Sequence, residues 1–160
     1  MDKAIITADE VFGKVTTVLD DIGMKYDSNK DERIVSFSMA TSDLDVRYSV
    51  CVEDSLRLRM LLEMPFTVRE NARIDVAYAV QKINSTLSFG NFDYDIERGL
   101  IWFRLSNGFE GVKFTELLVF SMFKWSSEVT DKYNDSLFML SVGKMTLDEF
   151  FAQLASDEEE

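Results

Sequence analysis

Apolar residues follow a helical period in two stretches of this chain. Their positions are Val11, Val15, Val18 and Ile22 in the first, and Val76, Val80, Ile83 and Leu87 in the second. Gly23 and Gly90 come directly after or shortly after these stretches, and glycine is the common residue at a helix C-terminus. The pattern therefore predicts two amphipathic helices, one on each side of a central region with a different period.

The starts of the helices are marked by a threonine three residues before a glutamate. In this arrangement each of the two side chains can bond a backbone N–H that the first helical turn leaves free. The pairs are Thr7 and Glu10, Thr67 and Glu70, and Thr146 and Glu149. The third pair predicts a further, short C-terminal helix from Leu147 to about Ala155.

Between the first two helices the apolar period is two. Residues 44–52 and 56–64 both place apolar side chains at even positions, which is typical of half-buried antiparallel strands. We expect these strands to be joined around residues 53–55 and to end at Pro65. We expect a preceding strand at residues 33–39, after a short one at 25–28. We also expect residues 92–96 and 100–105 to form a hairpin that follows the second helix.

A third long helix is expected from about Lys113 to Tyr133. Seven of the nine residues in the stretch LLVFSMFKW, from Leu117 to Trp125, are apolar, and they point nearly all around the helix axis. Such a helix must be covered on most sides. Two arrangements would cover it: the sheet and the C-terminal helix with Phe150 and Phe151, or a second subunit.

These elements follow one another in the order α-β-β-β-α-β-β-α with an extra C-terminal helix. The order predicts an α+β fold, in which helices pack on a mainly antiparallel sheet of five to six strands. A chain of 160 residues fits one domain, which we place at residues 1–155, and residues 156–160 form an acidic, frayed tail.

Charge and cysteine content narrow the functional class. The net charge of −12 disfavours nucleic acid and anionic membrane surfaces as partners. No stretch of about 20 apolar residues is present, and the N-terminus lacks the apolar run of a signal peptide. The single cysteine, Cys51, suits a reducing compartment. We therefore expect a cytoplasmic protein.

The chain offers little catalytic chemistry. It has no histidine, so Ser-His and Cys-His nucleophiles and the usual zinc sites are excluded. It also has no glycine-rich phosphate loop. Residues 27–38 imitate the start of a calcium-binding loop, but Glu32 stands where glycine is needed and Ser38 where the bidentate glutamate belongs. We expect a polar turn there, no cofactor, no metal and no enzyme.

The hairpin at 44–64 brings charged side chains together. If Val52 faces Leu56, Cys51 lies opposite Arg57, and Ser49 lies opposite Arg59. A neighbouring cation favours the thiolate form of a cysteine. Cys51 is thus either a reactive thiol or simply a small strand residue.

The later hairpin extends the same face of the sheet. Pairing Tyr94 with Phe103 places Asp93 opposite Arg104 and Asp95 opposite Trp102. The second face of the sheet would then carry a set that we call the arginine face: Arg47, Arg57, Arg59, Trp102 and Arg104. Arginine and tryptophan are favoured in binding sites, so this face could hold an acidic peptide or an anionic ligand. Alternatively, acidic side chains on the same face neutralise the arginines, namely Asp45, Glu53, Glu63, Asp93 and Asp95.

Several short motifs follow one another along the chain: Gly23-Met-Lys-Tyr26-Asp27, Glu63-Met-Pro65, Ile83-Asn84, Gly90-Asn91-Phe92, Asp95 and Gly99-Leu-Ile-Trp-Phe-Arg104. In this order and spacing they resemble the YbjN-type family, a group of bacterial proteins regarded as sensory transduction regulators. The resemblance spans about residues 8–135. The resemblance implies a fold like that of type III secretion chaperones, which are small, acidic, usually dimeric and hold extended segments of a partner. It implies no catalytic residues. The helical tail, residues 137–155, departs from the family pattern.

These observations predict a non-enzymatic interaction module, chaperone-like or regulatory, that binds a protein or peptide partner and can form a homodimer. The partner would contact the arginine face or an exposed part of the third helix. The alternative is a sensor of a small anionic ligand, held by the same arginines. An enzyme that uses Cys51 is the third hypothesis.

Overall fold

The computed structural model describes residues 6–157, which form one antiparallel sheet and a layer of helices. The strands are β1 (Asp27–Asn29), β2 (Ile34–Ala40), β3 (Asp45–Glu53), β4 (Arg57–Glu63), β5 (Asn91–Asp95) and β6 (Leu100–Gly108). The helices are α1 (Ala8–Asp21), the short 3-10 helix η1 (Glu70–Ala72), α2 (Arg73–Thr86), α3 (Glu116–Ser141) and α4 (Leu147–Asp157). The element order and the α+β class are those expected from the sequence.

The sheet has the strand order β1-β2-β3-β4-β6-β5. The chain leaves β4, forms α2, returns as the edge strand β5 and then inserts β6 between β5 and β4. One face of every long strand is apolar, because residues such as Val50, Met60 and Leu105 lie side by side in the register. All three are essentially fully buried. The alternation in the sequence therefore identifies the buried face correctly.

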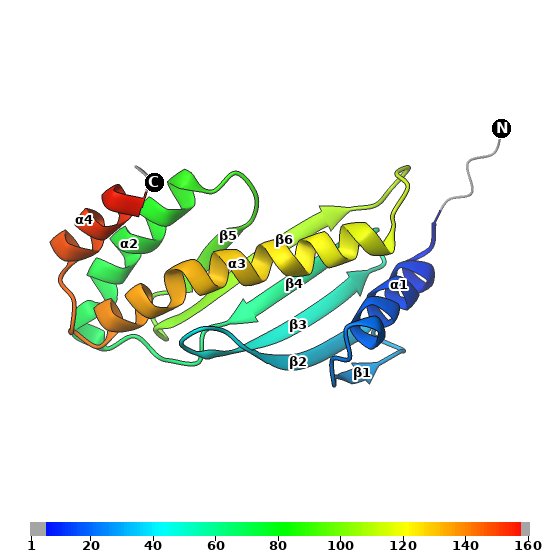
Figure 1. Ribbon diagram of the computed structural model, residues 1–160, viewed down its shortest axis with the longest axis horizontal. Coiled ribbons are helices and arrows are strands. Elements are labelled where there is room, and N and C mark those ends of the chain that lie inside the picture. The colour runs from blue at the N-terminus through cyan, green and yellow to red at the C-terminus, as the bar shows by residue number, and fades with distance from the viewer. Residues whose placement is uncertain (1–5, 158–160) are drawn as a thin grey trace.

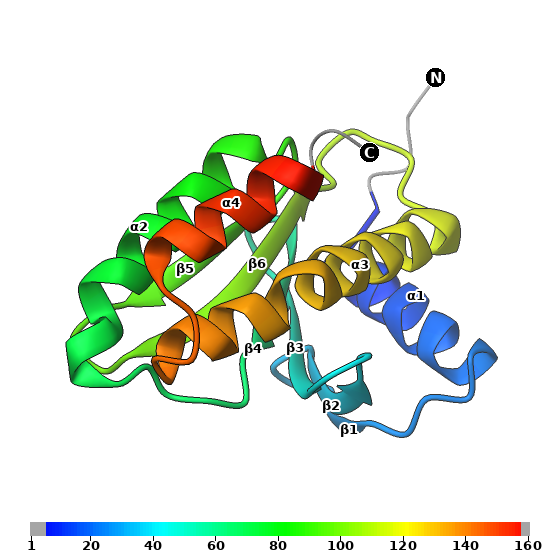
Figure 2. The same cartoon turned by 60° about the vertical axis from the view of Figure 1, so that its left-hand side comes forward.

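The helices cover this apolar face. Helix α3 runs along the sheet, α1 lies beside it over β3, and α2 packs on β5 (Figures 1 and 2). Phe123 of α3 inserts between the helix and the strands, where its ring lies 5.8 Å from that of Phe37 and 6.1 Å from that of Tyr48. The core of the protein thus lies between the sheet and α1, α2 and α3, and Phe150 and Leu154 of α4 extend it.

Two of the three predicted threonine–glutamate caps are confirmed. In α1, Thr7 Oγ1 accepts the Glu10 N–H, and a Glu10 carboxylate oxygen accepts the Thr7 N–H at 2.7 Å. Thr146 and Glu149 repeat this arrangement before α4.

The prediction of a cap at Thr67 and Glu70 is wrong. The segment after β4 remains extended because Val68 N–H bonds the Gly99 carbonyl at 2.8 Å and Arg69 N–H bonds the Ser141 carbonyl at 3.3 Å. The helical turn η1 begins only at Glu70, without a side-chain cap, and α2 follows from Arg73.

Helix α3 is longer than predicted and is covered differently. It continues to Ser141 because Leu137 and Leu140 are buried against the core. Helix α4 lies beside α2 at the far end of α3, so it does not cover the stretch that begins at Leu117 (Figure 1). Leu117 and Phe120 accordingly remain 72% and 44% exposed.

The remaining boundaries differ little from those expected. Helix α4 extends to Asp157, whereas the sequence placed its end near Ala155, and the other residues of the predicted acidic tail lie outside the described residues. None of the helices within residues 6–157 is long and apolar enough to cross a membrane.

Candidate functional site

The five residues predicted to form the arginine face do share one face of the sheet. It is the face opposite to the helices, since each of them alternates with a buried neighbour along its strand. Arg47, Arg57 and Arg104 are exposed, whereas Arg59 and Trp102 are partly buried. No helix of the described chain packs against this face.

The predicted pairing of β3 with β4 is wrong by two residues. Cys51 lies opposite Arg59, and Arg57 lies opposite Glu53. The difference arises in the turn, where Leu56 adopts a positive φ of 59° and belongs to the loop, so that its N–H bonds the Glu53 carbonyl. The sequence pattern had counted Leu56 as the first residue of the strand.

The predicted pairing of β5 with β6 is also wrong by two residues. Asp93 lies opposite Trp102, and Asn91 lies opposite Arg104. The turn holds four residues, from Ile96 to Gly99, and closes with a 2.7 Å bond from Gly99 N–H to the Asp95 carbonyl.

Acidic neighbours neutralise two of the arginines. The Arg104 guanidinium binds both carboxylate oxygens of Asp93, with Nε 2.8 Å from Oδ2 and the NH2 nitrogen 3.1 Å from Oδ1. The same carboxylate accepts the Trp102 indole N–H at 3.1 Å. Arg59 lies 3.4 Å from a carboxylate oxygen of Glu53. Within the described chain, Arg47 and Arg57 form no ion pair. The arginine face therefore contains arginines that acidic neighbours neutralise and arginines that remain unpaired, which are the two alternatives predicted from the sequence.

A hollow of about 490 Å³ occupies the middle of this face. We call it the open-face hollow. Its lining residues are Ile34, Ser36, Arg47, Ser49, Leu61, Glu63, Leu100 and Trp102. Only Arg47 and Trp102 belong to the predicted set; Arg57, Arg59 and Arg104 lie outside the hollow.

The apolar part of the open-face hollow was missed by the sequence analysis. Ile34, Leu61 and Leu100 are partly buried side chains at positions that the alternating pattern assigns to the polar face. The sequence signal of such a residue is an apolar side chain at an otherwise polar position of a strand, and it can be seen for Leu61, which follows Arg57 and Arg59 in the alternation. Together with Trp102 they give the face an apolar patch.

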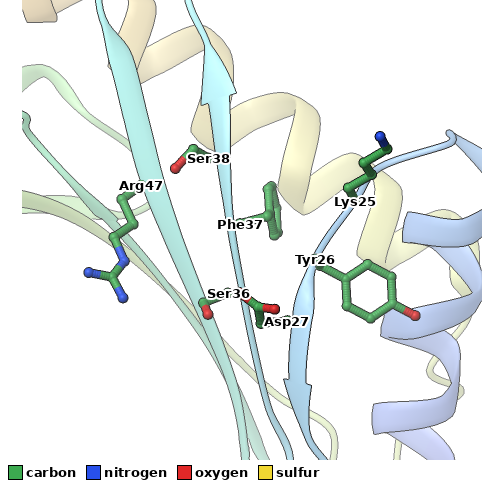
Figure 3. Close-up of a pocket in the computed structure, with 7 residues that line it drawn as sticks. All are labelled: Lys25, Tyr26, Asp27, Ser36, Phe37, Ser38 and Arg47. Carbon is green, nitrogen blue, oxygen red and sulfur yellow. The ribbon is translucent and has the colours of Figure 1, made fainter.

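A second hollow, of about 300 Å³, adjoins the first at the edge of the sheet. The two share Ser36 and Arg47, and the edge hollow adds Lys25, Tyr26 and Asp27 next to β1. Figure 3 shows Arg47 on β3 directed away from Phe37, which points toward α3. The Arg47 guanidinium thus stands between the two hollows, where it can reach a ligand in either.

The remaining candidate sites from the sequence are the calcium-loop imitation and Cys51. The calcium-loop imitation is the polar turn between β1 and β2: Asn29 Oδ1 accepts the N–H groups of Asp31 and Glu32 at 3.1 and 3.2 Å. Within residues 6–157, no cluster of three histidine, cysteine or acidic side chains could hold a metal ion. Cys51 is a partly buried free cysteine on the arginine face.

Comparisons with known proteins support the fold. No protein-family model matches this chain, and no curated protein matches it by sequence. Among solved structures, the chain is similar to the crystal structure of YbjN from E. coli, a protein proposed as a transcription regulator. The similarity covers 78% of this chain and 92% of YbjN, with a TM-score of 0.55 and 14% sequence identity. At this identity the two proteins share a fold, and the relationship expected from the sequence motifs is confirmed at that level.

Proposed function

We propose that this chain is a non-enzymatic interaction module that binds a segment of a partner protein in the open-face hollow. The observation that supports this most directly is the composition of the hollow. An apolar patch of Leu61, Leu100 and Trp102 lies beside Arg47, which forms no ion pair in the described chain although Glu63 lies opposite it in the register. Buried aromatic and arginine side chains dominate the energy of protein interfaces. A partner segment with an apolar side chain followed by a carboxylate would fit.

The fold likeness is consistent with a regulatory or chaperone-like role. YbjN is itself proposed as a transcription regulator, and the sequence motifs resemble the YbjN-type family. Because fold alone is a poor guide to function, the proposal depends on the hollow and not on the neighbour. We place its action in the cytoplasm, where a lone cysteine remains reduced.

Charge reversal of Arg47 tests the proposal. Arg47→Glu places a negative charge between the two hollows, and we expect it to abolish partner capture in affinity purification from cells of the source organism, measured by quantitative mass spectrometry. Arg57→Glu is the matched control, since it makes the same charge change on the same face but outside the hollow. Equal loss or equal retention of the same partner in both variants would contradict the assignment of the open-face hollow as the binding site.

A homodimer is a separate part of the proposal. The exposed Leu117 and Phe120 offer α3 as the contact surface. Native mass spectrometry would then give a species of twice the chain mass, and Leu117→Asp would return it to one chain mass. A species of one chain mass in the unmodified protein removes the homodimer and leaves the open-face hollow untouched.

The second candidate function is a sensor of a small anionic ligand. Ser36 and Ser49 line the open-face hollow together with Arg47, and hydroxyl groups beside a guanidinium are typical donors to a carboxylate or phosphate. Such a ligand would raise the melting temperature in a metabolite screen, because it binds only the folded state. The effect should disappear in Arg47→Glu and persist in Arg57→Glu.

A further inference from the structure

A separate cavity lies on the other side of the sheet, between α1, α3 and strands β2 and β3. We call it the helix-side cavity, and its volume is about 210 Å³. Its lining residues are Leu19, Ile22, Met24, Phe37, Met39, Tyr48, Phe120, Phe123, Lys124 and Ser127. All but Lys124 and Ser127 are apolar or aromatic. None of these residues belongs to the open-face hollow.

The cavity has an inner end and a mouth. Leu19 is completely buried at the inner end, whereas Ile22 and Phe120, at the mouth, are 47% and 44% exposed. Helices α1 and α3 are held together by the ion pair between Lys14 Nζ and Glu116 Oε1, at 2.8 Å. In the single chain, Ile22 and Phe120 leave the mouth open to solvent.

One corner of the cavity carries hydrogen-bond donors. Lys124 and Ser127 are three residues apart on α3, so they share one side of the helix. The buried Tyr48 hydroxyl has no hydrogen-bond partner within the described chain. Burial raises the pKa of Tyr48, and the nearby hydroxyls of Ser126 and Ser127 oppose that rise without completing a hydrogen bond. Ser126 is already occupied, since its Oγ donates to the Phe123 carbonyl at 3.0 Å.

The Tyr48 hydroxyl is unusual because buried polar groups nearly always have a partner. At neutral pH it is a donor, and it adjoins a cavity that also presents an ammonium and a serine hydroxyl. Lys124 is not firmly held elsewhere: its Nζ lies 3.8 Å from Glu128 Oε1, and both side chains are more than half exposed. Exposed pairs of this kind contribute little to stability.

From these contacts we infer that the helix-side cavity binds a small aliphatic carboxylate. The hydrocarbon chain lies among Leu19, Phe37 and Phe123, and the carboxylate accepts hydrogen bonds from Lys124, Ser127 and the Tyr48 hydroxyl. The cavity volume is below the roughly 300–1,000 Å³ of common ligand pockets, which favours a short chain over a long lipid. The protein has a net charge of −12, so a carboxylate needs a local cation to bind, and Lys124 supplies one at this cavity.

Isothermal titration with the straight-chain acids from butanoate to octanoate tests the inference. We expect one binding site, with an affinity that rises about fourfold for each added methylene until the cavity is full. Octanol, which has the same chain without the charge, should bind at least about tenfold more weakly. Absence of octanoate binding at millimolar concentration, or equal binding of octanol, would overturn the inference.

Three variants locate the site. Lys124→Met keeps an unbranched side chain of nearly the same length but removes its charge, and should weaken octanoate binding by about tenfold. Lys132→Met is the control on the same helix, outside this cavity, and should bind as the unmodified protein does. Tyr48→Phe removes a hydroxyl that has no partner, so the free protein should be at least as stable while octanoate binds more weakly. Unchanged binding in both Lys124→Met and Tyr48→Phe would show that octanoate does not occupy this cavity.

Discussion

The two faces of the sheet are built from the same strands but differ in the burial and the contacts of their side chains. On the helix-covered face, side chains such as Phe103 and Met60 are fully buried and pack as a continuous apolar layer. On the arginine face, the neighbouring Trp102 and Arg104 are held by one carboxylate, that of Asp93. The comparison separates side chains that are buried in the core from side chains that face solvent and have only polar contacts within the sheet. It also shows that a strand can change roles from one residue to the next.

Truncating adjacent residues of β6 gives the largest expected contrast. Phe103→Ala removes a ring packed 5.1 Å from that of Phe92 and should lower the free energy of unfolding by about 3–5 kcal/mol. Trp102→Ala removes a partly exposed ring and one hydrogen bond, and should cost only about 1–2 kcal/mol. Urea unfolding followed by circular dichroism measures both, since tryptophan fluorescence would change with the substitution itself. Equal losses would mean that the arginine face is covered in solution.

A smaller contrast concerns the caps of the helices that cover the sheet. Thr7→Ala removes the oxygen that accepts the Glu10 N–H, and should lower the free energy of unfolding by about 1 kcal/mol. Thr67→Ala is the matched control: the same sequence pair is present, but the segment is extended and caps no helix. This exposed substitution should change stability by less than about 0.5 kcal/mol. Thermal unfolding of the two variants side by side distinguishes the real cap from the apparent one.

The sequence predicts the faces of this sheet well and its register poorly, and the two outcomes have one cause. Apolar alternation has a period of two, so a shift of the pairing by two residues leaves every side chain on the same face. The turns decide between such registers. Leu56 adopts a left-handed conformation that usually favours glycine or asparagine. Because leucine is unusual in this conformation, the local sequence does not indicate that Leu56 belongs to the turn and that the strand begins one residue later.

The false cap at Thr67 has a similar explanation. A threonine and a glutamate at the right spacing are necessary for the cap, but the backbone must also be free to turn. Here the hydrogen bonds of Val68 and Arg69 to Gly99 and Ser141 hold the segment straight. These partners are distant in sequence, and no local pattern contains them.

The candidate site could be predicted only in part, because alternation fixes the face of a side chain but not its neighbours. The face that carries Arg47 and Trp102 follows from alternation alone. Which arginines keep a free charge does not, because the ion pairs run diagonally to the register. Glu53 lies opposite Arg57 but pairs with Arg59, and Asp93 lies opposite Trp102 but pairs with Arg104. The helix-side cavity is lined by the end of α1, the N-terminal half of α3 and two strands, so its residues come together only in the folded chain.

The last prediction uses pH to sharpen the distinction between real and apparent caps. The backbone N–H of Thr7, and then its hydroxyl, hold the pKa of Glu10 below its ordinary value of 4.5. A carboxyl whose pKa is lower in the folded state contributes stability above the unfolded pKa and loses it as the pH falls through the folded value. Glu10→Gln should therefore be less stable than the unmodified protein at pH 7, and the difference should shrink below pH 4.5 until it disappears in more acidic buffer. In a Thr7→Ala background the same substitution should keep most of this pH dependence, since only the hydroxyl is lost and the backbone N–H, the larger cause of the lowered pKa, remains. The measurement is the melting temperature, between pH 7 and pH 3, of the unmodified protein, Glu10→Gln, Thr7→Ala and the double variant. If the difference between Glu10→Gln and the unmodified protein does not depend on pH, Glu10 acts through helix propensity and not through its charge.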